Sequence, residues 1–308
     1  MSRIHEALKK AAQERSTQIG AGLDRDVADV AAEIHRPVTV EPVVAVLAEQ
    51  PRATIGGGHT GSMRYEEIVR RCSRPDWRLD PRASAFQDSN SGHSGAERFR
   101  TLRSRLSQIA GTRTLRRLLI TSSVAGEGKT FVASNLGQSI VRQPGRRVLL
   151  LDADIRMSRL HVGLGAPSRP GLTEYLRGEA DEYSIIQKGM EGNLFLIPGG
   201  SPVFNPSELL LHERMKRLLD LLTSAFDWII IDSPPALLVH DASILADLAD
   251  GVLFVVQAGM THVGEAEKAA EEFQNKNLLG VVLNKVEKRD SYGAYYHGHL
   301  SENAEKAT

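Results

Sequence analysis

The stretch Leu118–Ser134 reads LLITSSVAGEGKTFVAS, and the interpretation of the whole chain begins from it. It starts as an apolar run typical of a buried strand, passes through a glycine-rich turn and continues as a helix. The backbone N–H groups of such a turn, together with the positive end of the helix dipole, bind phosphate groups. We expect Lys129 to reach the β- and γ-phosphates of a nucleotide and Thr130 to ligate Mg²⁺. The stretch therefore predicts a nucleoside triphosphate site.

The turn departs at one position from the pattern G-x-x-x-x-G-K-[ST], because Ser123 stands where the first glycine is expected. A turn that only joins strand to helix is the alternative to a nucleotide site. Since the turn lies between a strand pattern and a helix pattern, we favour the nucleotide site. The residues expected to contact the nucleotide, ATP in this prediction, are Gly126, Glu127, Gly128, Lys129, Thr130 and Phe131.

Composition excludes several classes of protein. The 308 residues are 41% hydrophobic and 25% charged, which is ordinary for a globular chain, and the formal net charge of zero predicts no nucleic-acid partner. The single cysteine, Cys72, excludes an internal disulfide and fits a reducing compartment. There is no apolar run close to the ~20 residues that cross a bilayer and no secretory signal. We expect a cytoplasmic protein that reaches the membrane only through a partner.

Beyond the glycine-rich turn, strand patterns alternate with helix patterns. Strands are predicted at 147–152, 194–198, 228–232, 251–257 and 278–284, and helices at 134–143, 172–177, 183–188, 206–222, 241–248 and 263–275. Continuous apolar strands separated by helices indicate an α/β fold, a mostly parallel sheet with helices on both faces. Ligands of such sheets bind at the carboxyl ends of the strands.

Acidic and amide side chains follow three of these strands. Asp152 and Asp154 lie on the same side of an extended segment, where they can hold Mg²⁺ or accept a proton from an attacking hydroxyl. Asp232 ends another apolar strand and can orient the hydration shell of Mg²⁺. Asn284 ends the last strand, and its amide can read the edge of adenine. A helix cap or an ordinary loop position is the alternative for each.

The N-terminal part of the chain has weaker patterns. Residues 1–18 predict a short amphipathic helix, either a docking peptide or a frayed end. Residues 19–94 are interrupted by prolines and by a glycine triplet, and we predict a largely flexible linker there. Within it, 38–47 fits a strand and 65–71 fits one or two helical turns.

Two further segments carry groups that point to interactions. The predicted helix 96–109 places Glu97, Arg100 and Arg103 in a row, which can pair with a neighbouring copy or form a solvated face. The tail, 289–308, contains Tyr292, Tyr295 and Tyr296 in a polar, glycine-containing context. Their phenols are phosphorylatable, and a tail that packs on a partner is the alternative.

Taken together, the motifs TSSVAGEGKT, NPSELL, LLLDADIRMSRLH and IIIDSPP resemble those of the bacterial tyrosine kinases (BY-kinases) of polysaccharide biosynthesis. The opening SRIHEALKKA is similar to that of cytosolic autokinases from exosortase-linked exopolysaccharide loci. The resemblance covers about 95–298. It implies a P-loop NTPase fold with a Walker A loop, and a tyrosine kinase domain at 95–288. The segment Met157-Ser158 departs from the family, which often carries Arg-Pro there.

The resemblance also implies roles for individual residues. Lys129, Asp152 and Asp154 would be catalytic; Thr130, Asp152 and Asp232 would hold Mg²⁺; Gly126–Phe131 and Asn284 would bind ATP; Glu97, Arg100 and Arg103 would mediate oligomerisation; and Tyr292, Tyr295 and Tyr296 would be phosphorylated by a neighbouring subunit in a ring. The implied partners are a membrane-embedded chain-length regulator (a polysaccharide co-polymerase), other copies of the chain and a tyrosine phosphatase. The implied activity is that of an autokinase controlling exopolysaccharide chain length or export.

Two other functions fit the same core. A MinD/ParA-like switch ATPase hydrolyses ATP to control partner binding and phosphorylates no protein. Such proteins carry a second lysine early in the phosphate loop, whereas residues 122–125 here read SSVA. This difference and the tyrosine tail favour the kinase. A silent scaffold that binds ATP and only assembles is the third possibility.

Overall fold

The computed structural model describes residues 62–86, 92–189 and 192–286. The predicted helix at 1–18, the predicted strand at 38–47 and the tyrosines Tyr292, Tyr295 and Tyr296 lie outside these residues. Among the described helices, none is long and apolar enough to cross a membrane.

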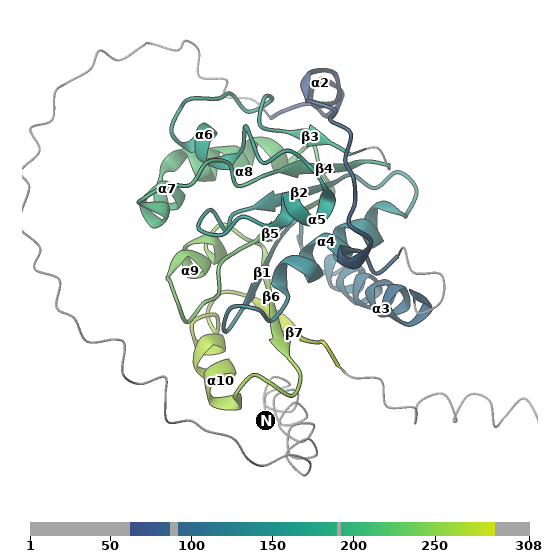
Figure 1. The fold of residues 1–308 in the computed structure, drawn as a ribbon, viewed down its shortest axis with the longest axis vertical. Helices are drawn as coiled ribbons and strands as arrows, with labels where there is room; N and C mark the ends of the chain where they lie inside the picture. Colours follow the sequence, from purple (N-terminus) through teal and green to yellow (C-terminus); the bar gives the residue numbers. More distant parts are fainter. Residues whose placement is uncertain (1–61, 87–91, 190–191, 287–308) are drawn as a thin grey trace, which may run out of the picture.

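A seven-stranded sheet forms the centre of the fold (Figure 1). In spatial order its strands are β3 (Gln187–Lys188), β4 (Leu194–Ile197), β2 (Val148–Asp152), β5 (Trp228–Asp232), β1 (Arg117–Ser122), β6 (Gly251–Gln257) and β7 (Leu278–Asn284). All neighbouring pairs are parallel except β3 and β4, which are antiparallel. The prediction of an α/β fold with a mostly parallel sheet is confirmed.

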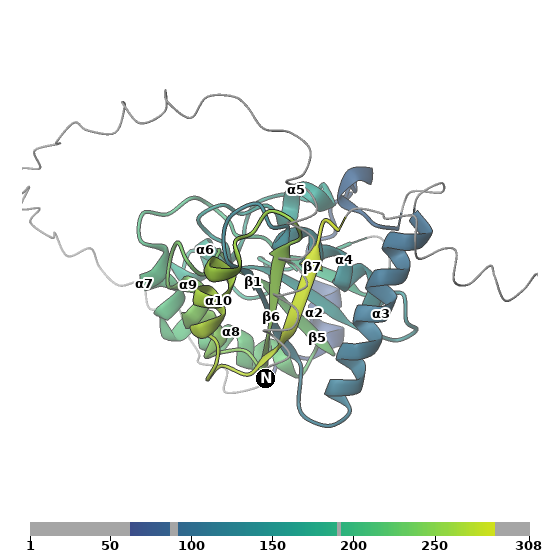
Figure 2. The same cartoon turned by 90° about the horizontal axis from the view of Figure 1, so that it is seen from below.

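Helices cover both faces of this sheet, as the sequence predicted. The helices are α2 (Tyr65–Arg71), the short 3₁₀ helix η1 (Pro81–Ala83), α3 (Gly92–Ala110), α4 (Lys129–Val141), α5 (Leu160–Leu164), α6 (Leu172–Leu176), α7 (Pro206–Leu211), α8 (Glu213–Thr223), α9 (Asp241–Ala246) and α10 (Val263–Glu271). Viewed from below, α3 and α10 lie on opposite sides of β6 and β7 (Figure 2).

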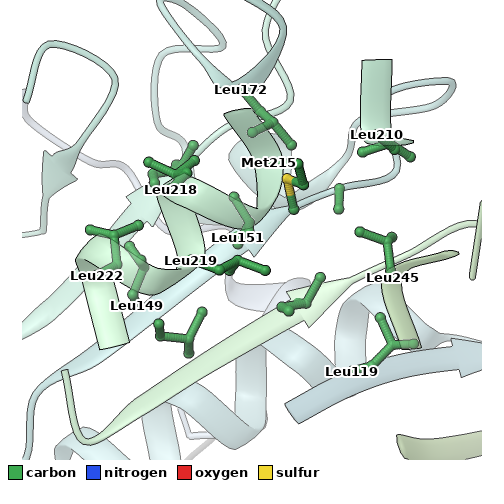
Figure 3. Packing of buried hydrophobic residues seen from close by; sticks show 14 of the residues in the cluster. Leu119, Leu149, Leu151, Leu172, Leu210, Met215, Leu218, Leu219, Leu222 and Leu245 are labelled. Carbon is green, nitrogen blue, oxygen red and sulfur yellow. The ribbon is translucent and has the colours of Figure 1, made fainter. Parts of the chain in front are cut away.

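Alternating strand residues supply two separate apolar cores. Leu118 and Ile120 pack in the core that α3, α4 and α5 cover, whereas Leu119 packs in the core on the opposite face. In this second core Leu218, Leu219 and Leu222 of α8 lie over β2 (Figure 3). Burial on both faces explains why the strands read as continuous apolar runs.

Part of the predicted linker 19–94 is ordered, which corrects the prediction for those residues, whereas α2 confirms the helical turns predicted at 65–71. Residues 62–86, here called the strap, cross the domain from the end of α8 to α4. The N–H of Met63 donates to the carbonyl of Leu221 at 3.1 Å, and Ser73 forms an isolated parallel bridge with Gln187. The Asn135 side chain holds Ala83 and Ala85. Met63, Ile68 and Cys72 of the strap are buried in the apolar core that α8 covers.

Two helix predictions were also wrong. Residues 183–188 form turns that lead into the edge strand β3 rather than a helix. The predicted helix 206–222 is divided into α7 and α8 because His212 is extended, with ψ at 141°. Its imidazole accepts a hydrogen bond from the N–H of Arg214 and so caps α8.

Candidate active site

The predicted site residues meet at the carboxyl edge of the sheet. Asp152 and Asp232 end adjacent parallel strands and are Cα partners in the register of β2 and β5. Ile120, near the end of β1, pairs with Asp232 from the other side, and β1 leads directly into the glycine-rich turn. The crossover topology therefore brings together three segments that lie far apart in sequence.

Lys129, the first residue of α4, points into this group of carboxylates. Its Nζ lies 3.0 Å from Oδ2 of Asp154. Burial alone would lower the pKa of Lys129, but the negative charges of Asp232 and Asp154 outweigh burial and raise it. The lysine is therefore a fixed cation at the mouth of the phosphate loop.

Asp152 is fully buried, and its two oxygens have different surroundings. Oδ2 accepts hydrogen bonds from the Ser158 hydroxyl at 2.7 Å and from the N–H groups of Arg159 and Leu160, each at 3.0 Å. Oδ1 is buried and has no hydrogen-bond partner. Burial raises the pKa of this carboxyl to about 6, although the bonds from Ser158 and Leu160 act in the opposite direction.

Asp232 is also fully buried, and neither of its carboxylate oxygens has a hydrogen-bond partner. The Thr130 hydroxyl faces it without completing a bond of normal geometry. Burial raises the pKa of Asp232 to about 8; the charge of Lys129 opposes this increase, and the charge of Asp152 adds to it. Three unpartnered oxygens on two neighbouring carboxylates are costly unless a ligand satisfies them.

The donor set fits Mg²⁺. No group of three or more His, Cys, Asp or Glu side chains among the described residues has a geometry that would hold a metal by itself. Mg²⁺ is commonly bound through one or two carboxylates, with waters and substrate phosphates completing the octahedron. The unpartnered oxygens of Asp152 and Asp232, beside the Thr130 hydroxyl and the phosphate loop, match that requirement.

The glycine-rich turn has the conformation that a phosphate loop needs. Gly126 and Gly128 adopt positive φ values of 87° and 93°, which favour glycine. Among the described residues, the non-glycine residues with positive φ are Asn277 and Lys285. Ser123 is therefore in a conformation open to any residue, which explains why the first glycine of the pattern is dispensable here.

The side chain of Glu127, a predicted nucleotide contact, points away from the loop opening. It is buried, and its carboxylate accepts hydrogen bonds from the N–H of Val124 at 2.8 Å, the N–H of Gln257 at 3.2 Å and the hydroxyl of Thr261 at 2.5 Å. Glu127 thus fastens the loop to the end of β6, and only its backbone remains available to a phosphate.

Asn284 and its neighbour also hold the loop. The Asn284 amide donates to the carbonyl of Glu127 at 2.8 Å, and Lys285 Nζ donates to the carbonyl of Gly126 at 2.7 Å. Asn284 therefore lies beside the phosphate loop, where its predicted contact with adenine stays a prediction. Phe131, in the first turn of α4, packs against Phe99 of α3, with ring centroids 5.9 Å apart.

An ion pair near the site, between a partly exposed arginine and a buried aspartate, was not anticipated from the sequence. The Arg156 guanidinium donates to Oδ2 of Asp241 at 2.7 Å, and the Ser207 hydroxyl donates to Oδ1 of the same carboxylate at 2.6 Å. Asp241 is fully buried. The pair joins the loop after β2 to α7 and α9. Arg156 follows Asp154 by two residues, which was the available signal, but its partner lies 85 residues away.

The predicted oligomerisation residues on α3 divide into two environments. Arg100 pairs with Glu97 at 2.9 Å on the exposed face of the helix. Arg103 turns inward, and its guanidinium donates to the carbonyl of Ser139 on α4 at 2.7 Å. Glu97 and Arg100 are therefore available to a neighbouring copy, whereas Arg103 is engaged within its own chain.

Known proteins with similar sequences and folds identify the family of this chain. The model of the CobQ/CobB/MinD/ParA nucleotide binding domain matches residues 118–305. The chain is 35% identical over 204 residues to the tyrosine-protein kinase YwqD of Bacillus subtilis, covering 65% of this chain and 86% of that protein. This chain belongs to the bacterial tyrosine-protein kinases. The kinase domain of the Escherichia coli tyrosine kinase ETK has the same fold, with a TM-score of 0.63 and 31% identity, covering 74% of this chain and 88% of that domain.

Other bacterial tyrosine kinases are much longer than the region they share with this chain. The putative tyrosine-protein kinase EpsB of Ralstonia solanacearum is 36% identical over 208 residues, which is 65% of this chain and 27% of that protein. This bacterial tyrosine kinase therefore corresponds to about a quarter of EpsB.

Proposed function

We propose that this protein is an ATP-dependent protein-tyrosine autokinase that phosphorylates Tyr292, Tyr295 and Tyr296 of a neighbouring copy. The observation that carries the proposal is the convergence of Lys129, Asp152 and Asp232, from three separate segments, next to a phosphate loop. Membership of the bacterial tyrosine-protein kinases supports a tyrosine hydroxyl as the phosphoryl acceptor. The tyrosine tail supplies the acceptor hydroxyls within the chain itself.

Each residue of the site has a distinct proposed role. The N–H groups of the loop and the Lys129 ammonium bind the phosphates and stabilise the charge on the transferring group. Mg²⁺, held by Thr130, Asp152 and Asp232, would neutralise phosphate charge when bound. Asp152 has one unpartnered oxygen, Oδ1, which would either ligate Mg²⁺ or accept the phenol proton. Asp154 holds Lys129 in place through the 3.0 Å ion pair.

The cellular setting follows from the resemblance seen in the sequence. We propose control of exopolysaccharide chain length or export, with a membrane-embedded chain-length regulator as the activating partner. A homo-oligomer would bring the tail of one copy to the site of the next, and a tyrosine phosphatase would reverse the modification. The protein would then be cytoplasmic and held at the inner face of the membrane by its partner.

A switch ATPase is the alternative, because the matching family model includes MinD and ParA. Residues 122–125 contain no lysine, unlike the early loop lysine of such switches. The test is incubation of the full chain with γ-labelled ATP and Mg²⁺, comparing wild type, Lys129→Met and a variant with all three tail tyrosines changed to Phe. We expect label on wild-type protein and on neither variant. Label that persists in the triple variant removes the tail as the acceptor, and phosphate release without labelled protein supports the switch.

A further inference from the structure

The hydroxyl of Ser158 joins two loops at the carboxyl edge of the sheet. It donates a hydrogen bond to Oδ2 of Asp152 at 2.7 Å, and the N–H of Gly199 donates to it at 3.3 Å. His161 Nδ1 lies 3.2 Å from the same oxygen. Ser158 therefore connects the carboxylate at the end of β2 with the loop that follows β4.

The direction of each hydrogen bond follows from what a serine hydroxyl can do. It has one proton and two lone pairs. A backbone N–H can only donate, so Gly199 uses one lone pair. With the proton directed to the Asp152 carboxylate, His161 must donate from Nδ1 to the second lone pair. All three bonding capacities of the hydroxyl are then used, and its orientation is fixed.

This orientation determines which oxygen of Asp152 is free. Oδ2 is saturated by Ser158 and by the two backbone N–H groups of Arg159 and Leu160. Oδ1 has no partner and lies on a carboxylate whose register partner is Asp232. The carboxylate thus presents a single oxygen to the site.

The packing around Gly199 is fitted to this serine. A Cβ added at Gly199 would lie 2.7 Å from both Cβ and Oγ of Ser158, closer than real side-chain contacts allow. Any other residue at position 199 would have to displace Ser158. The arrangement therefore depends on a pair of residues from two loops that are 41 positions apart in sequence.

We propose that Ser158 is a positioning residue for phosphoryl transfer, which holds Asp152 with Oδ1 toward the nucleotide and its metal. The inference rests on the proposed kinase function. Ser158 touches neither substrate nor metal and acts through Asp152.

Steady-state phosphorylation by the full chain tests the proposal. We expect Ser158→Ala to lower kcat about 10-fold, because a hydrogen bond to a charged group is lost. Ser158→Thr keeps the hydroxyl and should restore kcat. Ser184→Ala is the matched control, since the hydroxyl of that exposed serine donates to the carbonyl of Asp181 in a surface turn, away from the site. A Ser158→Ala protein with the kcat of this control overturns the proposal, as does failure of threonine to restore it.

A second readout needs no turnover. Calorimetric titration of ADP with and without Mg²⁺ gives the factor by which the ion tightens nucleotide binding. We expect this factor to fall in Ser158→Ala and in Gly199→Ala, and to be unchanged in Ser184→Ala and Ser158→Thr. An unchanged factor in both of the first two variants overturns the inference. A wild-type protein that binds Mg²⁺ and ADP normally but phosphorylates nothing instead overturns the proposed function, so the two failures are distinguishable.

Discussion

Asp152 and Asp232 are register partners at the carboxyl ends of the adjacent parallel strands β2 and β5, and both are completely buried. Neighbouring strands are about 4.8 Å apart, so two carboxylates here repel each other in a region that water does not reach. Lys129 supplies a compensating positive charge. The fold therefore keeps an electrostatically unfavourable pair at the point where a cation and a polyphosphate would relieve it.

The first prediction concerns the pH dependence of stability without nucleotide. The pKa of Asp232 is about 8 in the folded protein and about 3.9 when unfolded, so between these values the folded state keeps a proton that the unfolded chain has released. The contribution of Asp232 to the free energy of unfolding is therefore fully present below about pH 3.9, and it is lost as the pH rises from there to about 8. Asp232→Asn should remove this loss and raise the free energy of unfolding near pH 8 by on the order of 1 kcal/mol.

Urea unfolding of the metal-free protein at about pH 6 and about pH 8 measures this effect. Asp76→Asn, which changes an exposed carboxylate paired loosely with Arg78, serves as the control and should behave as wild type. If wild type and Asp232→Asn had the same free energy of unfolding at about pH 8, the charge of Asp232 would not destabilise the folded protein, and the prediction would be wrong.

The second prediction concerns the buried carboxylate that fastens the phosphate loop. Glu127→Ala leaves the donors of Val124, Gln257 and Thr261 without an acceptor, so we expect a loss of about 2–3 kcal/mol of stability and weaker ATP binding. Glu127→Gln keeps one acceptor oxygen, so its stability and its affinity for ATP should lie between those of the wild type and Glu127→Ala. Nucleotide titration measures the affinity for ATP, and denaturant unfolding measures the stability. An unchanged affinity in Glu127→Ala would show that the phosphate loop keeps its binding conformation without this anchor.

The third prediction concerns the strap. The Asn135 side chain is fully buried and pairs with the carbonyl of Ala83 at 2.9 Å and the N–H of Ala85 at 2.6 Å. We expect Asn135→Ala to cost about 2 kcal/mol and to make 80–86 more susceptible to limited proteolysis than in the wild type. Arg82→Ala is the control, because that side chain is exposed. Equal cleavage patterns in the two variants would mean that Asn135 does not hold the strap.

The fourth prediction concerns the ion pair between Arg156 and Asp241. Arg156→Gln leaves Asp241 buried with only the Ser207 hydroxyl, and we expect a loss of about 2 kcal/mol because Arg156 is partly exposed. Asp241→Asn combined with Arg156→Gln should cost less than the sum of the single changes. Additive losses in this double-mutant cycle would indicate that the two residues act independently.

The sequence was most informative where local pattern and burial agree. Trp228–Asp232 is a strand with the predicted bounds, because a fully buried parallel strand is a continuous apolar run. The positions of Asp152 and Asp232 at one edge followed from the topology of parallel sheets. Their roles in catalysis and metal binding remain predictions, although their unpartnered oxygens fit those roles.

Other features depended on contacts between distant residues. The break at His212 has no glycine or proline to signal it, and the apolar periodicity continues through it. The strand β3 exists because Gln187 and Lys188 lie beside β4, not because two residues have strand propensity. Similarly, the inward turn of Glu127 depends on Thr261, 134 positions away. These features require the folded chain and cannot be derived from spacing alone.

The most direct test of the kinase is the intact mass of the full chain after incubation with ATP and Mg²⁺, followed by peptide mapping. The proposed function predicts that wild type gains up to three phosphoryl groups, located on Tyr292, Tyr295 and Tyr296, and that Lys129→Met gains none. Consumption of ATP with no gain in protein mass would contradict it.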